Sequence, residues 1–305
     1  MRIGIPRALL YYRYKTLWKV FFEQLGIETI ISDKTDKKIM DAGAYYSIDE
    51  ACLSSKLYLG HIDSLIDKCD FIFVPRIANY ATKGILCTRF EAIYDMAMST
   101  FRDKNVRFIT LDVDLEQKKS EEKAYIDLGI RLGATKTQAK RAYEMALNAM
   151  ILELNNLSDM QNKLLDMNKV RILIASHPYN LYDEYIGVPV TKLLKKLDVV
   201  PIMADRADLK LMQQQYTNIC KDIPWIMSRE IVGAVSHYLD KVDGIILMTA
   251  FPCGPDSMVN EMILRRVKNK PILNLLLDSQ DGIAGVDTRL ESFVDIIRFR
   301  RGEII

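Results

Sequence analysis

RIGIP at residues 2–6 reads as a buried β-strand, and an aromatic-rich helix is predicted after it over Tyr14–Leu25. A second strand, IETIIS, is predicted at Ile27–Ser32. Strands joined by a helix of about ten or more residues pair in parallel, because the helix returns the chain to the same end of the sheet. The same alternation continues along the chain and indicates an α/β fold with parallel sheets. Further strands are predicted at Phe71–Pro75, Val106–Val113, Val170–Ala175, Val199–Met203, Gly244–Thr249 and Pro271–Leu277.

A charged segment interrupts this alternation and divides the chain into three parts. It carries stretches such as EQKKSEEK at 116–123 and contains no proline. We interpret it as a solvated helical pair, because charge runs of this kind are typical of a wet helix face. The sequence therefore predicts an N-terminal α/β lobe at 1–114, a helical connection at 115–167 and a C-terminal α/β lobe at 168–305. Helices in the second lobe are predicted at 183–197, 209–240 with a break at Pro224, 255–267 and 288–299.

Composition excludes several classes of protein. The 305 residues include 42 Lys+Arg and 40 Asp+Glu, so the net charge of +2 argues against a nucleic-acid-binding module. A hydrophobic content of 49% is enough for a core and excludes a disordered chain. No apolar run approaches the roughly 18 residues of a membrane helix, and no signal peptide is recognisable. We expect a cytoplasmic protein whose 5 cysteines are thiols or metal ligands.

Three cysteines are predicted at the edge of the sheets where ligands bind. In an open parallel sheet this is the edge formed by the carboxyl ends of the strands, where helix N-termini also point. Cys87 follows the strand Phe71–Pro75, and Cys253 follows the strand Gly244–Thr249 within FPCGP. Cys52 opens a helix in DEACLSSK. The alternative for each of the three is a small buried hydrophobic residue.

The remaining two cysteines have a different predicted setting. Cys69 immediately precedes its strand and so belongs to the opposite edge, and Cys220 is expected deep in a helical stretch. We interpret both as structural. Beside Cys253, Gly254 is expected to allow an unusual backbone, and Pro255 suits the first turn of a helix.

The spacing of the three edge cysteines indicates the kind of metal centre. They come from separate loops without a CxxC pair, whereas a structural zinc site prefers paired ligands at short spacing. Cysteine thiolates are the usual ligands of iron–sulfur clusters, and three of them would leave one iron of a four-iron cluster open. Helix N-termini directed at the site would help to hold an anionic cluster.

Six motifs together carry a family resemblance. They are IGIPRALLYY at 3–12, IDEACLSSKLYLGH at 48–61, VPRI at 74–77, SHPYNLYDEYIG at 176–187, FPCGPDSMVNE at 251–261, and KPILNLLLD with AGVDTRLESFVD at 270–295. On these motifs the chain resembles the 2-hydroxyacyl-CoA dehydratase-related proteins, in particular the group associated with the dehydratase activases. The resemblance covers nearly the whole chain except the charged helices.

The resemblance implies two Rossmann-like lobes and a [4Fe–4S] cluster held by Cys52, Cys87 and Cys253. It also implies an ATP-dependent activase-type partner that supplies electrons at very low potential. Because GxxxxGK[ST] is absent from the sequence, the chain looks like the electron acceptor and not the ATPase. A double-cubane [8Fe–9S] cluster, as in some relatives, would need more thiolates and so would be shared between chains. We expect an oligomer with an acyl-CoA or small-molecule substrate.

The sequence departs from the family pattern at two places. Cys87 is followed by Thr88-Arg89-Phe90 where relatives have a Pro-Lys-Phe continuation. After Asp278 the chain has Ser279-Gln280-Asp281-Gly282-Ile283, where relatives carry two acidic residues and a histidine. The changes at Ser279, Gln280 and Ile283 leave open a non-catalytic scaffold or cluster-delivery partner as the alternative to a dehydratase-like or reductase enzyme.

Several other side chains are candidates for the site. His177 follows a strand and is a candidate acid, with backbone capping as its alternative; Glu50 is a candidate proton-transfer carboxylate, or a charge facing a helix dipole. Arg7 is expected to offset cluster or phosphate charge. Ser257 and Asn260 are candidate donors to the cluster, with N-capping as the alternative. His61 and His237 are expected to be structural.

Overall fold

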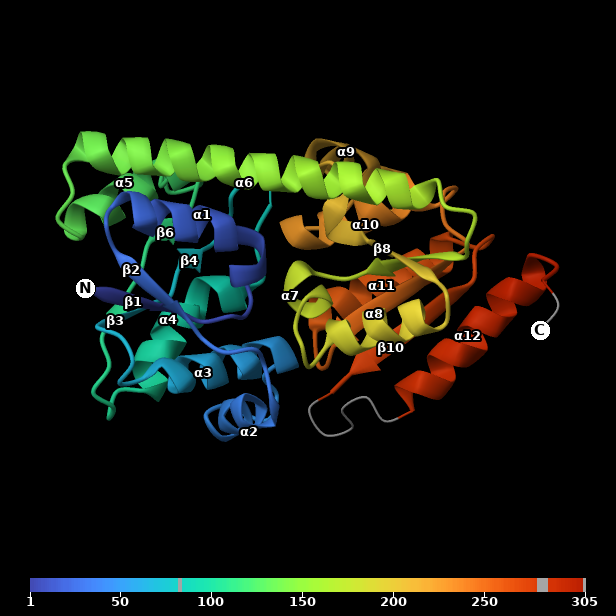
Figure 1. The fold of residues 1–305 in the computed structure, drawn as a ribbon, viewed down its shortest axis with the longest axis horizontal. Helices are drawn as coiled ribbons and strands as arrows, with labels where there is room; N and C mark the ends of the chain where they lie inside the picture. Colours follow the sequence, from blue (N-terminus) through green and yellow to red (C-terminus); the bar gives the residue numbers. More distant parts are fainter. Residues whose placement is uncertain (82–83, 279–284, 304–305) are drawn as a thin grey trace. The chain divides into compact units, whose positions relative to one another are not determined.

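The computed structural model describes residues 1–81, 84–278 and 285–303. The chain forms two compact units, one of residues 1–154 with 224–226 and the other of residues 155–223 with 227–305. Each contains a four-stranded parallel sheet with helices on both faces, which confirms the predicted α/β class (Figure 1). The division of the chain into 1–114, 115–167 and 168–305 stays a prediction, since the structure groups residues 115–154 with the first unit.

The sheet of the first unit has the order β2-β1-β3-β5, with all neighbours parallel. β1 is central, and its Ile3 is in register with Thr29 on one side and Phe71 on the other. Right-handed crossovers in opposite directions place α1 on one face and α3 and α4 on the other. The strands are β1 (Arg2–Ile5), β2 (Glu28–Ile31), β3 (Phe71–Phe73) and β5 (Phe108–Ile109), and the helices are α1 (Tyr11–Gln24), α2 (Lys37–Tyr45), α3 (Leu53–Leu65) and α4 (Thr88–Thr100).

The single strand predicted at Val106–Val113 is wrong, because it is divided into β5 and a second strand, β6 (Asp112–Val113). β6 pairs in parallel with β4 (Arg76–Ile77), which follows β3 along the chain as β6 follows β5. Pro75 lies between β3 and β4 and has no N–H to donate. On either side of it the parallel spacing continues, with Val74 N donating to the Ile109 carbonyl and Arg76 N to the Leu111 carbonyl, both at 2.9 Å.

The charged segment contains two helices, and part of each enters the core of the first unit. They are α5 (Glu121–Arg131) and α6 (Lys136–Leu165). Tyr125 of α5 is 1% exposed and accepts a 2.8 Å hydrogen bond from Trp18 Nε1 of α1. Its ring also stacks on Tyr143 of α6, with the centroids 5.1 Å apart. The predicted pair of helices is therefore present with most of its charged residues exposed, and one aromatic stripe of it packs against α1.

The sheet of the second unit has the order β10-β9-β7-β8 and is also parallel throughout. β7 is central, and its Leu173 pairs with Ile202 on one side and Ile245 on the other. The strands are β7 (Arg171–Ala175), β8 (Val200–Met203), β9 (Gly244–Ala250) and β10 (Ile272–Leu277). The helices are α7 (Pro178–Leu181), α8 (Gly187–Lys196), α9 (Leu209–Gln215), α10 (Ile226–Tyr238), α11 (Gly254–Arg266) and α12 (Val286–Arg300), with 3-10 turns η1 (Ala204–Arg206) and η2 (Tyr216–Asn218).

Both units thus have the same strand order. In each, the first strand is central, the second lies on one side of it, and the third lies on the other side with the fourth beyond it. β1 therefore corresponds to β7, and β3 to β9. In each sheet the chain first passes from the central strand to the neighbour on one side, and later crosses back to form the neighbour on the other side. This reversal creates a switch point at the carboxyl edge of the sheet.

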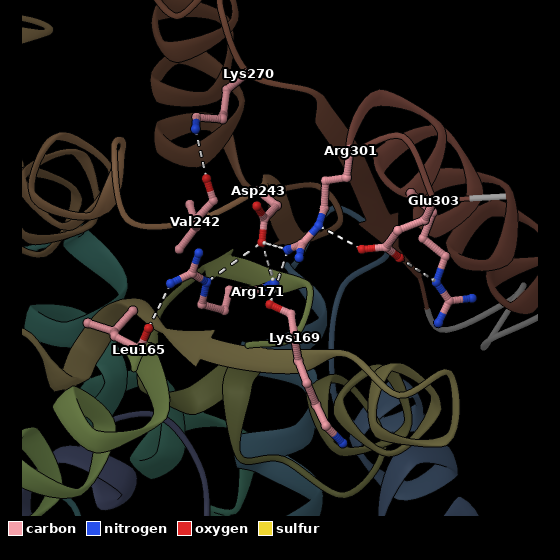
Figure 2. A network of polar contacts seen from close by, with 9 residues as sticks. Leu165, Lys169, Arg171, Val242, Asp243, Lys270, Arg301 and Glu303 are labelled. Carbon is pink, nitrogen blue, oxygen red and sulfur yellow. Dashed lines mark hydrogen bonds and ion pairs between the residues drawn. The ribbon is translucent and has the colours of Figure 1, made fainter. Parts of the chain in front are cut away.

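The amino edge of the second sheet is fixed by a polar network around Asp243 (Figure 2). Asp243 Oδ2 accepts hydrogen bonds from the backbone N–H of Arg171 at 2.7 Å and from the guanidinium of Arg301 at 3.1 Å. Arg171 in turn donates to the Leu165 carbonyl at 2.7 Å. This carboxylate therefore joins the start of β7 to the end of α12 on the side of the sheet away from the predicted ligands.

Candidate functional site

Two of the three predicted ligand cysteines begin helices at the carboxyl edge of the first sheet. α3 leads into β3 and α4 leads into β5, so both helices start at the carboxyl edge and return the chain to the amino edge. Cys52 is the N-cap residue of α3, with φ −63° and ψ 150°, and Cys87 is that of α4, with φ −57° and ψ 138°. Both thiols are half-buried. Their positions are those that the sequence predicted, and their role as ligands stays a prediction.

Cys253 has the corresponding position in the second unit. It follows β9 and is the N-cap residue of α11, with φ −83° and ψ 108°. Because β3 corresponds to β9, Cys87 and Cys253 cap equivalent helices of the two sheets. The Cys253 carbonyl accepts from Ser257 N at 3.1 Å and from Ser257 Oγ at 2.8 Å. Ser257 is therefore bonded back to the first turn and does not act as an N-cap.

Gly254 and Asn260, both predicted near the cofactor, lie in α11, and their proximity to a cofactor stays a prediction. The φ of Gly254 lies outside the left-handed region, and a Cβ built on it would meet no atom within 4 Å, so the expected unusual backbone is wrong. Asn260 Nδ2 donates to Thr249 Oγ1 at 2.7 Å, which ties α11 to the end of β9. Glu50 is exposed and precedes the N-cap of α3 by two residues.

The thiols of the two remaining cysteines, Cys69 and Cys220, each donate a hydrogen bond to another group of the chain. Cys69 Sγ donates to the Leu65 carbonyl at 3.4 Å, and burial raises the pKa of its thiol. Cys220 lies in the loop after η2, so its expected place deep in a helix is wrong; its Sγ donates to Met262 Sδ at 3.3 Å. Pro224 and the residues before it end the helical pattern earlier than the sequence indicated.

His177 has a partner that the sequence did not reveal. It is the N-cap residue of α7, but its side chain does not cap the backbone of that helix, so the alternative of backbone capping is wrong. Instead Nε2 lies 2.8 Å from Oδ1 of Asp256, and the two side chains are 5% and 6% exposed. Asp256 is in the first turn of α11, where an acidic residue is ordinarily explained by the helix dipole. No sequence signal could distinguish that role from a buried pair.

Arg7 and His61 belong to a second buried polar cluster, at the carboxyl edge of β1. Arg7 Nε donates to the Ser32 carbonyl at 3.1 Å, and Ser32 Oγ lies 2.9 Å from His61 Nδ1. Thr35 Oγ1 lies 3.0 Å from the other ring nitrogen. Burial, with a smaller contribution from the charge of Arg7, lowers the pKa of His61 to about 3. His61 is therefore a neutral residue that joins α3 to the loop after β2.

The third histidine, His237, is in α10, and its Nε2 lies 2.9 Å from Lys241 Nζ. Partial burial, followed by the charge of Lys241, lowers the pKa of His237. Within residues 1–81, 84–278 and 285–303, no group of three or more His, Cys, Asp or Glu side chains is arranged to hold a metal ion. The departures at Ser279, Gln280 and Ile283 lie outside the described residues. Of the described helices, none combines the length and apolar character required to cross a membrane.

The fold and these positions define a class of protein with two Rossmann-like α/β units and thiols at the N-termini of their helices. The family model described as CoA enzyme activase uncharacterised domain matches residues 2–206, and the chain belongs to this family. The predicted membership of the chain in a CoA-enzyme activase-associated family is thereby confirmed. Among curated proteins, none matches the chain.

Two solved structures align over almost the whole chain at low similarity. ZnuA is 10% identical, with 98% of both chains covered and a TM-score of 0.26. FpvC of Pseudomonas aeruginosa in complex with Mn²⁺ is 11% identical, with 98% of this chain and 97% of that chain covered and a TM-score of 0.28. At TM-scores this low, neither structure provides information about the function or the metal content of this chain.

Proposed function

We propose that this chain is an iron–sulfur protein of the 2-hydroxyacyl-CoA dehydratase-like type. The observation that carries the proposal is that Cys52, Cys87 and Cys253 are each the N-cap residue of a helix that begins at the carboxyl edge of a parallel sheet. Cys69 and Cys220 have no such position. A [4Fe–4S] cluster is the proposed cofactor, with an [8Fe–9S] cluster shared between chains as the alternative nuclearity.

The donor set fits such a cluster chemically. Thiolate sulfur is the usual ligand of iron in these centres. The first backbone N–H groups of a helix have no intrahelical acceptor, so at each N-cap they favour negative charge on a thiolate and its cluster. All five cysteines are half-buried, so burial does not distinguish the three proposed ligands, and the Cys52 thiol itself lies 3.3 Å from Ser55 Oγ.

The cluster would supply one-electron chemistry at low potential, and the chain would hold and insulate it. An ATP-hydrolysing activase is the proposed electron donor, as the description of the family supports. The proposed substrate is an acyl-CoA or another small molecule, which the protein would dehydrate or reduce.

Anaerobic purification with iron and sulfide analysis tests the proposal. Wild-type protein is expected to contain about four irons per chain, or about eight per pair of chains for the shared cluster. Cys52→Ser, Cys87→Ser and Cys253→Ser variants should each lose most of the iron and the electron paramagnetic resonance signal of the reduced protein. Cys69→Ser and Cys220→Ser are the matched controls and should retain both. Wild-type protein that stays free of iron after anaerobic reconstitution would disprove the proposal.

A further inference from the structure

The second sheet has two edge strands, β8 and β10, which differ in how their outward backbone groups are used. Alternate residues of an edge strand direct their N–H and C=O groups away from the sheet, where a further strand can pair with them. Proteins usually block such an edge with proline, with charged residues or with a covering side chain. An apolar edge strand without these features is a surface for another strand.

The outward side of β8 is closed by a proline and a glutamine. Val200 N donates to the Val170 carbonyl at 2.8 Å, so the next residue, Pro201, faces outward, and Met203 does the same. Pro201 has no N–H that a further strand could use. Gln161 of α6 is fully buried; its Nε2 donates to the Met203 carbonyl at 2.9 Å, and its Oε1 accepts from Met203 N at 2.8 Å. One amide side chain thus occupies the place of a neighbouring strand.

The outward side of β10 is largely open within residues 1–81, 84–278 and 285–303. The carbonyl groups of residues 271 and 277 accept from β9 at 3.0 and 2.8 Å, so the odd-numbered residues of β10 face β9. Ile272, Asn274 and Leu276 therefore face outward. Of their backbone groups, only the Asn274 carbonyl has a partner in the described part of the chain, Arg289 Nη2 of α12 at 2.5 Å. β10 contains neither proline nor a charged residue, and Leu276 is 48% exposed.

An apolar face of α12 borders this open edge. Arg289 marks the side of α12 that reaches the outward side of β10, whereas Arg298, half a turn away, donates to the Leu197 carbonyl after α8 at 2.7 Å. Ile296 and Phe299 follow Arg289 by seven and ten residues, which places them on the same side of the helix as Arg289. They are 51% and 75% exposed. Burial of these side chains against another surface is therefore favourable.

We propose that the outward side of β10, together with Ile296 and Phe299 of α12, binds a second copy of this chain. Antiparallel pairing of the two β10 strands about a two-fold axis at Asn274 sets Ile272 of one copy opposite Leu276 of the other. Each outward residue then exchanges its N–H and C=O with the residue opposite, so that the two four-stranded sheets become one continuous sheet. The proposal does not depend on the iron–sulfur function.

The surface is complementary to itself, as a two-fold contact requires. Ile272 and Leu276 place apolar side chains opposite each other, and Asn274 at the axis has both an amide donor and an acceptor. A stable interface buries about 1,200 Å² or more, and the two α12 faces, which lie on the same side of the continuous sheet, add to the area of the strands. Arg289 opposes the contact, because it brings like charges near the axis and occupies one of the two lone pairs of the Asn274 carbonyl.

Sedimentation equilibrium of the full-length protein, purified in air so that no cluster is required, tests the interface. We expect a concentration-dependent species of twice the mass of one chain. Hydrogen exchange followed by mass spectrometry locates the contact, because the outward N–H groups of β10 gain acceptors only in the dimer. Peptides that cover β10 should gain about three protected amides at high concentration. A monomer at every concentration up to about 1 mM, or a dimer without this protection, would overturn the proposal.

Three variants change the affinity in defined directions. Leu276→Pro gives β10 the feature that closes β8 and should raise the Kd of the dimer at least about tenfold. Phe299→Glu should do the same without altering the strand, so the test remains valid if the proline disturbs folding. Arg289→Met should lower the Kd, since it removes the like charges and frees the Asn274 carbonyl.

Leu211→Glu, at an exposed apolar residue of α9, is the matched control and should leave the Kd unchanged. Circular dichroism of each variant checks that the fold is retained. A dimer that Phe299→Glu does not weaken, or that Leu211→Glu weakens equally, would contradict the assignment of the interface to β10 and α12.

Discussion

Gly60 of α3 packs directly on the backbone of Ile39 in α2, so that a Cβ added to Gly60 would overlap the carbonyl oxygen of Ile39. Gly43 of α2 is in the same situation against the carbonyl of Lys56. The close approach of the two helices needs a hydrogen atom at both positions. Since Cys52 begins α3, the packing of α2 also fixes the helix that carries this thiol.

The first prediction concerns this helix contact. Gly60→Ala should lower the free energy of unfolding by about 2 kcal/mol, because overlap with backbone atoms cannot be relieved by a side-chain rotation. Urea denaturation followed by circular dichroism measures the change. Gly254→Ala is the matched control, since its added methyl group meets no atom within 4 Å, and it should be within about 0.5 kcal/mol of wild type. Equal stability of the Gly60 variant and wild type would contradict the contact.

The second prediction follows from the buried His61. Its pKa is about 3 in the folded protein and 6.5 for an unperturbed histidine. The unfolded chain therefore takes up a proton at this residue below about pH 6.5 while the folded protein does not, so stability is present above that pH and is lost as the pH falls toward 3. Between pH 7 and pH 4 this one residue should cost about 3 kcal/mol.

His61→Gln provides the comparison, because glutamine can keep a hydrogen bond to Ser32 or Thr35 but does not titrate. Unfolding by urea at pH 7, 5.5 and 4 should show a smaller loss of stability in the variant than in wild type. Parallel curves for the two proteins would rule out a depressed pKa at this position.

The third prediction concerns the network in Figure 2. Asp243→Ala leaves the backbone N–H of Arg171 and the guanidinium of Arg301 without their shared acceptor. Loss of a partly buried carboxylate with two donors should lower the free energy of unfolding by about 2–3 kcal/mol. Glu261→Ala, which removes an exposed ion pair with Arg265, should cost less than about 0.5 kcal/mol. Similar losses in both variants would show that the network adds nothing beyond a surface ion pair.

The fourth prediction concerns the buried hydroxyl of Tyr125. Tyr125→Phe removes the acceptor of the Trp18 indole N–H but keeps the aromatic packing. An unpaired buried N–H should lower the free energy of unfolding by about 1–2 kcal/mol, and the fluorescence maximum of the two tryptophans should shift. Tyr45→Phe, at an exposed tyrosine, is the control. An unchanged stability of the Tyr125 variant would indicate that water replaces the hydroxyl.

Much of the fold could be predicted because strand and helix periodicity are local properties of the sequence. β1, β7 and β9 begin and end within one or two residues of the predicted strands. The break between β5 and β6 could not be predicted, because residues 106–113 contain no proline or glycine at which a strand would be expected to end. Likewise, Tyr125 is in a charged segment, and only the aromatic face of α1 explains its burial.

The candidate site was predictable to the extent that it follows from chain direction. The rule that crossover helices start at the carboxyl edge places Cys52, Cys87 and Cys253 without any knowledge of side-chain contacts. The pair of His177 and Asp256 was not predictable, since 79 residues separate its members and either residue has an ordinary local explanation. α2 was missed although its nine residues form an amphipathic helix, with Ile39, Met40 and Gly43 buried and the charged residues exposed.

The equivalent thiols of the two sheets are attached to their strands by very different lengths of chain. Residues 78–86 separate the end of β4, which continues β3, from Cys87, whereas residues 251–252 alone separate β9 from Cys253. A long connection tolerates insertions and deletions, and a connection of this shortness does not. Sequence change during evolution can therefore remodel the surroundings of Cys87 while β3 stays intact, but around Cys253 it would have to proceed by substitution alone.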